Sequence, residues 1–291
     1  MFSTKRVLAV MPDKAADLKL ADYLDFLAST SISIDTVNAF HAFTATHFFK
    51  HLNETPDKYG NVLLERMQKD MEKQLDGHLL NIPNKQVEVI SGQLVPQLIR
   101  KGYDATSDLI ALGEHSESDI TLSKQIIRHV PENCLFVPEK AAKSLSHILV
   151  PVDMSKHSAK LLEAAIHLKE MMGDDAIKIT CYHSFEVPSL SSYSMLQMGE
   201  EFTEKIKEKQ QETLHQFVEK HTGDKRSEIE EVVQEEIRSR PDRAIINYME
   251  KNGVDFLIMG SKSHSALDAW LGNTVERVIA KNDKVPMLII K

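Results

Sequence analysis

The sequence predicts an α/β fold class, with two tandem doubly wound domains that each contain a five-stranded parallel sheet. The first supporting observation is an internal repeat, in which three apolar runs recur in the same order at offsets of 141 to 153 residues. A period this long indicates a duplicated domain and not a short-repeat solenoid. The second is the alternation of strand-like apolar runs with segments of helical periodicity. The repeated runs are 7–11 with 148–152, 108–113 with 255–260, and 133–137 with 286–290.

Length and composition agree with a duplicated globular chain. The 291 residues correspond to about two domains. An apolar content of 42%, with 11 glycines and 10 prolines, is typical of ordinary folded proteins. We expect the first domain to span 1–140 and the second to span 145–291.

In the second copy, the continuous apolar run at 148–152 is typical of a central parallel strand. Ser155 is placed to cap a helix that continues to about Met172, and Gly173 is placed to end it. Pro241 stands near the start of a later helix. The other strands are expected at 177–182, 231–233, 255–260 and 285–290, the other helices at 199–221, 244–251 and 273–280, and loops at 184–194 and 261–271.

The first copy follows the same order, with a short polar join to the second at 138–146. Its second helix is unusually long and is expected at about 56–80. Its strands are expected at 7–11, 33–38, 86–90, 108–112 and 134–137.

Charge and hydropathy exclude several classes of protein. The net charge is −8, with basic and acidic residues interleaved, so the long-range field disfavours nucleic acid as a partner. No apolar run approaches the roughly 20 residues of a membrane span, and the N-terminus has no signal-peptide core. Cys134 and Cys181 fall in predicted strands of different copies, which indicates buried, reduced thiols. These features predict a cytoplasmic protein that does not bind a membrane.

Open parallel sheets bind ligands beyond the carboxyl ends of their strands, where the winding direction changes. In the second copy, a glycine closes the strand at 255–260, and small hydroxyl residues and a lysine follow it. Small residues let backbone N–H groups approach phosphate oxygens, and we expect residues 272–274 to open the next helix and add its partial positive charge. Asp153 is placed to accept a hydrogen bond from a base amine or a ribose hydroxyl. The candidate nucleotide-binding residues are Val152, Asp153, Gly260, Ser261, Lys262, Ser263, His264, Gly272, Asn273 and Thr274.

These segments resemble the universal stress protein family. The opening His147–Ser155 looks like its first-strand signature, and the runs 272–278 and 284–290 look like its C-terminal signature. The resemblance covers the chain as two copies, and it implies an adenine nucleotide alpha hydrolase-like fold and a stress-response protein that acts by binding. In ATP-binding members the aspartate at the first strand's end contacts adenine or ribose, and a glycine loop holds the phosphates. Carried over, these roles fall to Asp153, Gly260 and Gly272–Thr274.

The chain departs from the family's loop pattern of glycine, two residues, glycine, nine residues, glycine and serine or threonine. Ser263 stands at the second glycine, and serine tolerates a positive φ less well than glycine does. Only eleven residues separate Gly260 from Gly272, one fewer than in the pattern, and Asn273 replaces the serine or threonine, with Thr274 beside it. Three hypotheses stay open: ATP or adenine-nucleotide binding, a nucleotide-free interaction or scaffold protein, and a slow ATPase. No catalytic residue is assigned.

The first copy is a poorer phosphate site. Glu114, Glu117 and Asp119 follow its fourth strand and would repel a triphosphate. Pro12 occupies the position that corresponds to Asp153, with Asp13 displaced by one. We therefore expect the first copy to be structural.

Family members pair through their last strands. The resemblance therefore implies that Cys134–Val137 and Pro286–Ile290 pair within the chain, which hides two sheet edges, and homodimerisation is also open.

Three weaker patterns have plain structural interpretations. His41, His47 and His51 favour packing over a metal site, because no thiol or carboxylate joins them at ligand spacing. The segment Ser184–Met195 is a solvated loop or a lid, and Trp270 anchors a loop or touches a ligand.

Overall fold

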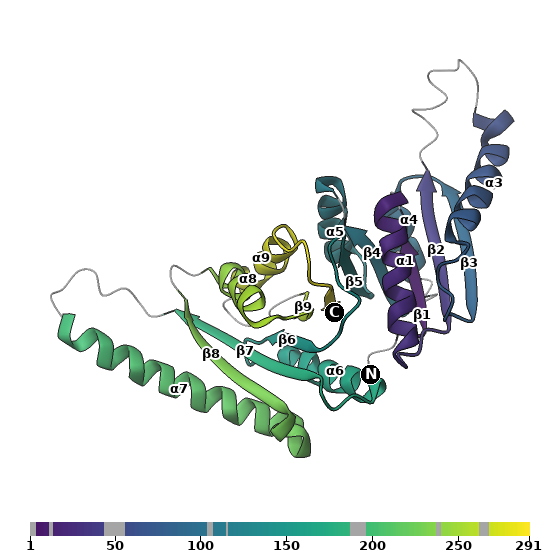
Figure 1. Cartoon of the computed structure of the whole chain (residues 1–291). Coiled ribbons are helices and arrows are strands. Elements are labelled where there is room, and N and C mark those ends of the chain that lie inside the picture. The colour runs from purple at the N-terminus through teal and green to yellow at the C-terminus, as the bar shows by residue number, and fades with distance from the viewer. Residues whose placement is uncertain are drawn as a thin grey trace. The chain divides into compact units, whose positions relative to one another are not determined.

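A computed structural model describes residues 4–11, 14–43, 56–103, 107–114, 116–186, 196–236, 240–261 and 268–291. The chain divides into two compact units. The first comprises Met1–Lys143 together with Pro286–Ile289 and Lys291, and the second comprises Ser144–Val285 together with Ile290. Figure 1 shows the helices and strands of each unit.

The sheet of the first unit has the strand order β3-β2-β1-β4-β5, and these five strands are parallel. The last strand of the chain, β10, adds to β5 in the antiparallel sense. The expected pairing of the two last strands is therefore present, with Leu288 opposite Leu135. The elements of this unit are β1 (Arg6–Val10), α1 (Lys14–Ser29), β2 (Thr36–Phe43), α3 (Pro56–Leu75), β3 (Asn84–Ser91), α4 (Leu94–Tyr103), β4 (Leu109–Glu114), α5 (Glu117–His129), β5 (Asn133–Pro138) and β10 (Met287–Ile290).

In the second unit the order β8-β7-β6-β9 repeats the order β3-β2-β1-β4 of the first, again with parallel neighbours. The helices α8 and α9 contact each other, as do α6 and α7. The elements are β6 (His147–Pro151), α6 (Lys156–Met172), β7 (Lys178–Glu186), α7 (Leu196–Thr222), the 3-10 helix η1 (Gly223–Glu228), β8 (Ile229–Glu236), α8 (Pro241–Asn252), β9 (Phe256–Gly260) and α9 (Asp268–Ile279).

The predicted fold class is confirmed, as are the local signals at the ends of α6. The hydroxyl of Ser155 accepts the backbone N–H of Ser158, and Gly173 ends the helix at φ 63°, where glycine meets no side-chain penalty. The central strands β1, β4, β6 and β9 are almost wholly buried, and Cys134 and Cys181 are buried free thiols, as predicted.

Three of the wrongly predicted boundaries affect candidate residues. The strand β2 extends to Phe43, so His41 lies on a strand and not in the segment after it. The strand β7 extends to Glu186, so the predicted loop at 184–194 begins with strand residues; residues 187–195 lie outside the described part of the chain. The helix α9 begins at Asp268, so residues 272–274 lie inside a helix that was expected to start there. Helix periodicity over 268–271 is compatible with either boundary, and sequence patterns place helix ends poorly.

The aspartate of the internal repeat ties the first strand of each unit to the fourth. Asp255, just before β9, accepts the backbone N–H groups of Ser146 at 2.9 Å and His147 at 2.8 Å, and the hydroxyls of Ser144 and Ser146. In the first unit, Asp108 accepts the backbone N–H of Arg6 at 3.0 Å and pairs with its guanidinium at 2.7 Å. Both carboxylates therefore satisfy backbone groups at the amino ends of neighbouring parallel strands.

Replacing Asp255 with alanine should lower the free energy of unfolding by about 3 kcal/mol, because two backbone N–H groups lose a charged acceptor. The matched control is Asp174→Ala, which removes an exposed carboxylate that accepts a single backbone N–H, that of Ala176. The control should change stability much less. Urea denaturation of both variants measures the difference, and equal losses would contradict the role given to Asp255.

Candidate functional site

The candidate site lies at the carboxyl ends of β6 and β9, which are parallel neighbours. Their register pairs Ile148 with Phe256 and Leu149 with Leu257. Continued along both strands, this register sets Val152 level with Gly260, and Asp153 level with Ser261. The structure thus brings the first four predicted site residues to one edge of the sheet, which is where open parallel sheets bind ligands.

Asp153 is held by the start of α6. Its Oδ1 accepts the hydroxyl of Ser158 and, at 3.0 Å, the backbone N–H of Ser155. The backbone N–H of Asp153 donates to the hydroxyl of Ser158 at 3.1 Å. The carboxylate is half-buried, so these bonds fix the direction of a charged group that still reaches the edge.

The next residue, Met154, has a backbone φ of 59°. A side chain with a Cβ rarely adopts this left-handed conformation, and strain of this kind concentrates at functional sites. The strained turn after β6 therefore lies directly beside the carboxylate of Asp153.

This turn is also held by a hydrogen bond from a histidine that the sequence analysis did not name as a site residue. The Nδ1 of His183, near the end of β7, lies 2.9 Å from the carbonyl oxygen of Val152 and donates to it. Burial lowers the pKa of His183, while that carbonyl, Gln210 and Asp153 act in the opposite direction. His41 makes the same bond to Met11 in the first unit, at 2.7 Å.

Because both copies keep this bond, the two histidines have a common structural role at the end of the first strand. The signal was present in the sequence, since His41 and His183 recur near the repeat offset. His47 and His51 lie outside the described residues. Among the described residues, no group of three histidine, cysteine, aspartate or glutamate side chains is placed to hold a metal ion.

The glycine-loop side of the site is only partly described. Gly260 ends β9, and the backbone N–H of Ser261 donates to the carbonyl oxygen of Ile290 at 2.9 Å. Ser261 therefore donates its N–H to the protein's own backbone. Lys262, Ser263 and His264 lie outside the described residues.

The segment Gly272–Thr274 lies in the second turn of α9. Backbone N–H groups at this depth bond to carbonyls four residues earlier, so only residues 268–271 have N–H groups left over for an anion. Thr274 is fully buried. The helix start therefore belongs to Asp268–Leu271, and the role of opening the helix does not fall to Gly272, Asn273 or Thr274. Trp270 lies in this first turn.

The equivalent edge of the first unit is filled by the protein's own carboxylates. Glu114, which matches Ser261 by the repeat offset, is 6% exposed and accepts the hydroxyl of Ser123 at 2.5 Å. Burial raises the pKa of Glu114 to about 7; the Ser123 hydroxyl opposes this shift, and Asp119 adds to it. Ser116 and Asp119 form a capping box at the start of α5. The two copies therefore present different chemistry at the same place.

Comparisons with known proteins fit this architecture of doubled α/β units. The model of the universal stress protein family matches residues 145–291. A universal stress protein of Archaeoglobus fulgidus has a similar solved structure, with a TM-score of 0.61 and 17% identity over 100% of this chain and 99% of that one. The chain therefore belongs to the universal stress protein family.

Two curated relatives show the duplication by their length. Universal stress protein MJ0577 of Methanocaldococcus jannaschii is 27% identical over 155 residues, and universal stress protein YxiE of Bacillus subtilis is 24% identical over 147 residues. Each match covers 50% of this chain, but 93% and 97% of those proteins. The chain is thus about twice as long as either relative. No helix among the described residues is long and apolar enough to cross a membrane.

The raised pKa of Glu114 predicts a pH-dependent stability. A carboxyl group whose folded pKa lies above its unfolded value stabilises fully below about pH 4.5, and this contribution is lost as the pH rises through about 7. Glu114→Gln keeps an acceptor for Ser123 and removes the buried charge. The variant should therefore gain stability over the natural protein by up to about 3 kcal/mol between these pH values.

Thermal unfolding from pH 4.5 to 8 measures this gain. Glu117→Gln is the matched control, since it removes an exposed carboxylate from the start of α5, the helix that follows Glu114. A gain for Glu114→Gln that does not change with pH would contradict the buried charge.

Proposed function

We propose that the protein is a cytoplasmic stress-response protein that acts by binding an adenine nucleotide, with ATP as the first candidate, in its second copy. One observation carries the proposal, namely the difference between the two strand edges. Where the first unit buries the carboxylate of Glu114, the second has Ser261 beside Gly260 and the oriented carboxylate of Asp153. An edge without a buried like charge admits a phosphate chain at a lower electrostatic cost.

Within this proposal, Asp153 accepts a hydrogen bond from the adenine amine or a ribose hydroxyl. The backbone N–H groups at the start of α9 face the phosphates, since they are the unpaired donors of that helix. Lys262 and His264 supply positive charge from the connecting segment, and Ser263 and Asn273 stand in for the family's glycine and hydroxyl residues. The proposal includes homodimerisation only as the association of two whole chains, in addition to the pairing of strands within each chain.

A nucleotide-free interaction protein is the second candidate, and two specific observations favour it. The N–H of Ser261 is already bonded to Ile290, and Gly272 lies inside a helix and not at its start. A ligand would then have to be held mainly by the segment after Ser261. Turnover has less support than either binding role, since the described edge shows no pair of groups arranged as nucleophile and base.

Isothermal titration calorimetry of the full chain with ATP, ADP and AMP tests the proposal. ATP should bind, and Asp153→Ala should weaken its affinity about tenfold, because a charged acceptor is lost. Glu114→Gln is the matched control at the equivalent edge and should leave the affinity unchanged. Absence of binding at millimolar ATP would favour the nucleotide-free role, and equal affinity of Asp153→Ala would remove Asp153 from the site.

A further inference from the structure

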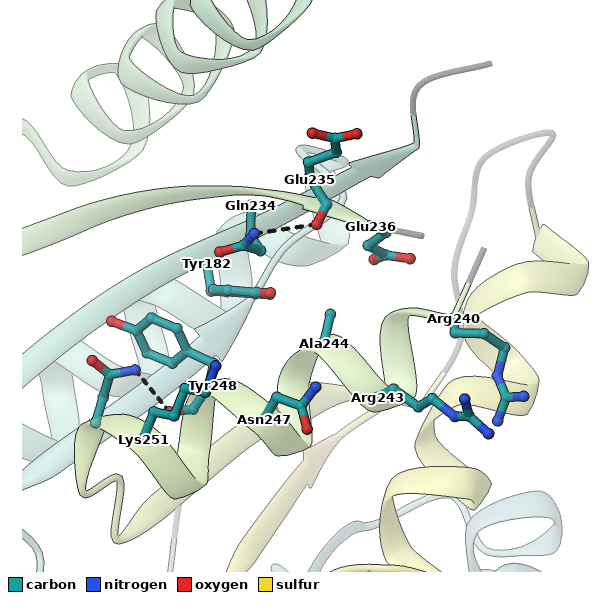
Figure 2. Close-up of a pocket in the computed structure, with 11 residues that line it drawn as sticks. Tyr182, Gln234, Glu235, Glu236, Arg240, Arg243, Ala244, Asn247, Tyr248 and Lys251 are labelled. Atoms are coloured by element: carbon teal, nitrogen blue, oxygen red, sulfur yellow. Dashed lines mark hydrogen bonds between the residues drawn. The ribbon is translucent and has the colours of Figure 1, made fainter. Parts of the chain in front are cut away.

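A groove in the second unit lies between α8 and the strands β7 and β8. Its volume is about 930 Å³. Figure 2 shows Tyr182, Gln234 and Glu236 along its strand side, with Asn247 and Tyr248 on α8 facing them. The strand β8 is the last in its sheet's order, and the groove runs beside it. The cavity is large enough for a small organic ligand.

Two buried polar groups on the strand side make no hydrogen bond of ordinary geometry with the described residues, although the hydroxyl of Ser184 and the backbone of Arg240 lie near Glu236. These two groups are the two carboxylate oxygens of Glu236 and the hydroxyl of Tyr182. Glu236 is only 4% exposed, and Tyr182 is 1% exposed. A buried polar group without a partner is unfavourable by a few kcal/mol, so natural proteins rarely keep one without a use. Three acceptor atoms that line one groove call for a ligand with several N–H donors.

The carboxylate of Glu236 forms no ion pair with a cation among the described residues. Burial raises its pKa; the hydroxyl of Ser184 and the backbone of Arg240 oppose this shift, and Glu186 and Asp242 add to it. Arg240 is engaged elsewhere, since its guanidinium donates to the two oxygens of Asp242 at 3.1 and 3.2 Å. A cationic group would therefore be favoured beside Glu236.

The aromatic side chains of the groove favour a guanidinium over an ammonium group as the cation. The rings of Tyr182 and Tyr248 lie 5.0 Å apart between centroids and are tilted by 49°. A guanidinium is planar, stacks on aromatic rings, and donates two parallel N–H bonds to a carboxylate. Glu236 offers both oxygens for such a pair, and it lines the same groove as Tyr182. An ammonium group would match only part of this arrangement.

The helix side of the groove carries charge of the opposite sign. Arg243 and Lys251 line it from α8. A ligand with positive charge alone would meet repulsion here, whereas a carboxylate would be attracted. We propose that this groove binds a small zwitterion with a guanidinium group, which pairs with Glu236 and Tyr182 while the ligand's carboxylate faces Arg243.

Three probes separate the parts of the proposal in calorimetry of the full chain. L-arginine carries both groups and should bind. L-citrulline has a neutral urea of the same shape in place of the guanidinium and should bind at least about tenfold more weakly. N-acetyl-L-argininamide keeps the guanidinium but has no free carboxylate, as in a peptide, and should also bind more weakly than L-arginine.

Two substitutions on the strand side test the residues. Glu236→Gln removes the charge and Tyr182→Phe removes the hydroxyl, and each should weaken L-arginine binding, the first by about tenfold or more. Arg243→Gln should abolish the preference for L-arginine over N-acetyl-L-argininamide. Glu231→Gln is the matched control on the same strand, where the carboxylate pairs with Arg226 at 2.9 Å and with His215 of α7. It should leave L-arginine binding unchanged.

The inference is independent of nucleotide binding, so Asp153→Ala should still bind L-arginine. Absence of binding at millimolar L-arginine would overturn the proposal. So would equal affinities for L-arginine and L-citrulline, or undiminished binding in both Glu236→Gln and Tyr182→Phe. If N-acetyl-L-argininamide bound with the same affinity as L-arginine, the proposed contact between the ligand's carboxylate and Arg243 would be wrong.

Discussion

The pairing of the first strand with the fourth is the constraint on which each unit of this protein depends. A doubly wound sheet changes its winding direction between these two strands, and its ligand edge lies at their carboxyl ends. At the opposite ends of the strands, Asp108 and Asp255 accept backbone N–H groups from the first strand. A charged acceptor at this point fixes the register between strands that are separated by about a hundred residues of chain. The repeated aspartate therefore has a structural role, although it lies in one of the runs whose recurrence indicates the duplication.

The two copies share the aspartate that accepts these backbone N–H groups and the histidine that bonds to the carbonyl after the first strand. They differ at the edge where a ligand would lie. His41 and His183 each hold the carbonyl that follows the first strand, so the backbone is positioned alike in both units. Beyond that point the side chains diverge. Glu114 is buried against Ser123 in the first copy, and Asp153 is directed by Ser155 and Ser158 in the second. The two copies therefore have the same backbone framework, but the side chains at their ligand edges differ.

Buried polar groups show where this scaffold departs from simple packing. Glu114 is buried, yet the protein itself supplies a hydrogen-bond donor in Ser123, so this carboxyl group has a structural explanation. Glu236 and Tyr182 are as deeply buried, and they line a groove with acceptor atoms that receive no hydrogen bond of ordinary geometry from a described residue. The difference between a satisfied and an unsatisfied acceptor separates a structural carboxyl from one available to a ligand.

The fold class, the duplication and the local ends of α6 could be predicted from the sequence, because they depend on apolar periodicity, a repeat offset and single capping residues. The meeting of Asp153 and Gly260 at one edge could be predicted too, since parallel strands place their carboxyl ends together. The sequence could not predict the start of α9, the bond from Ser261 to Ile290 or the burial of Glu114, because these depend on contacts between distant segments. The groove beside β8 was invisible in the sequence for the same reason. Tyr182 and Glu236 are separated by more than fifty residues, and only the pairing of β7 with β8 puts their unsatisfied acceptors in one cavity.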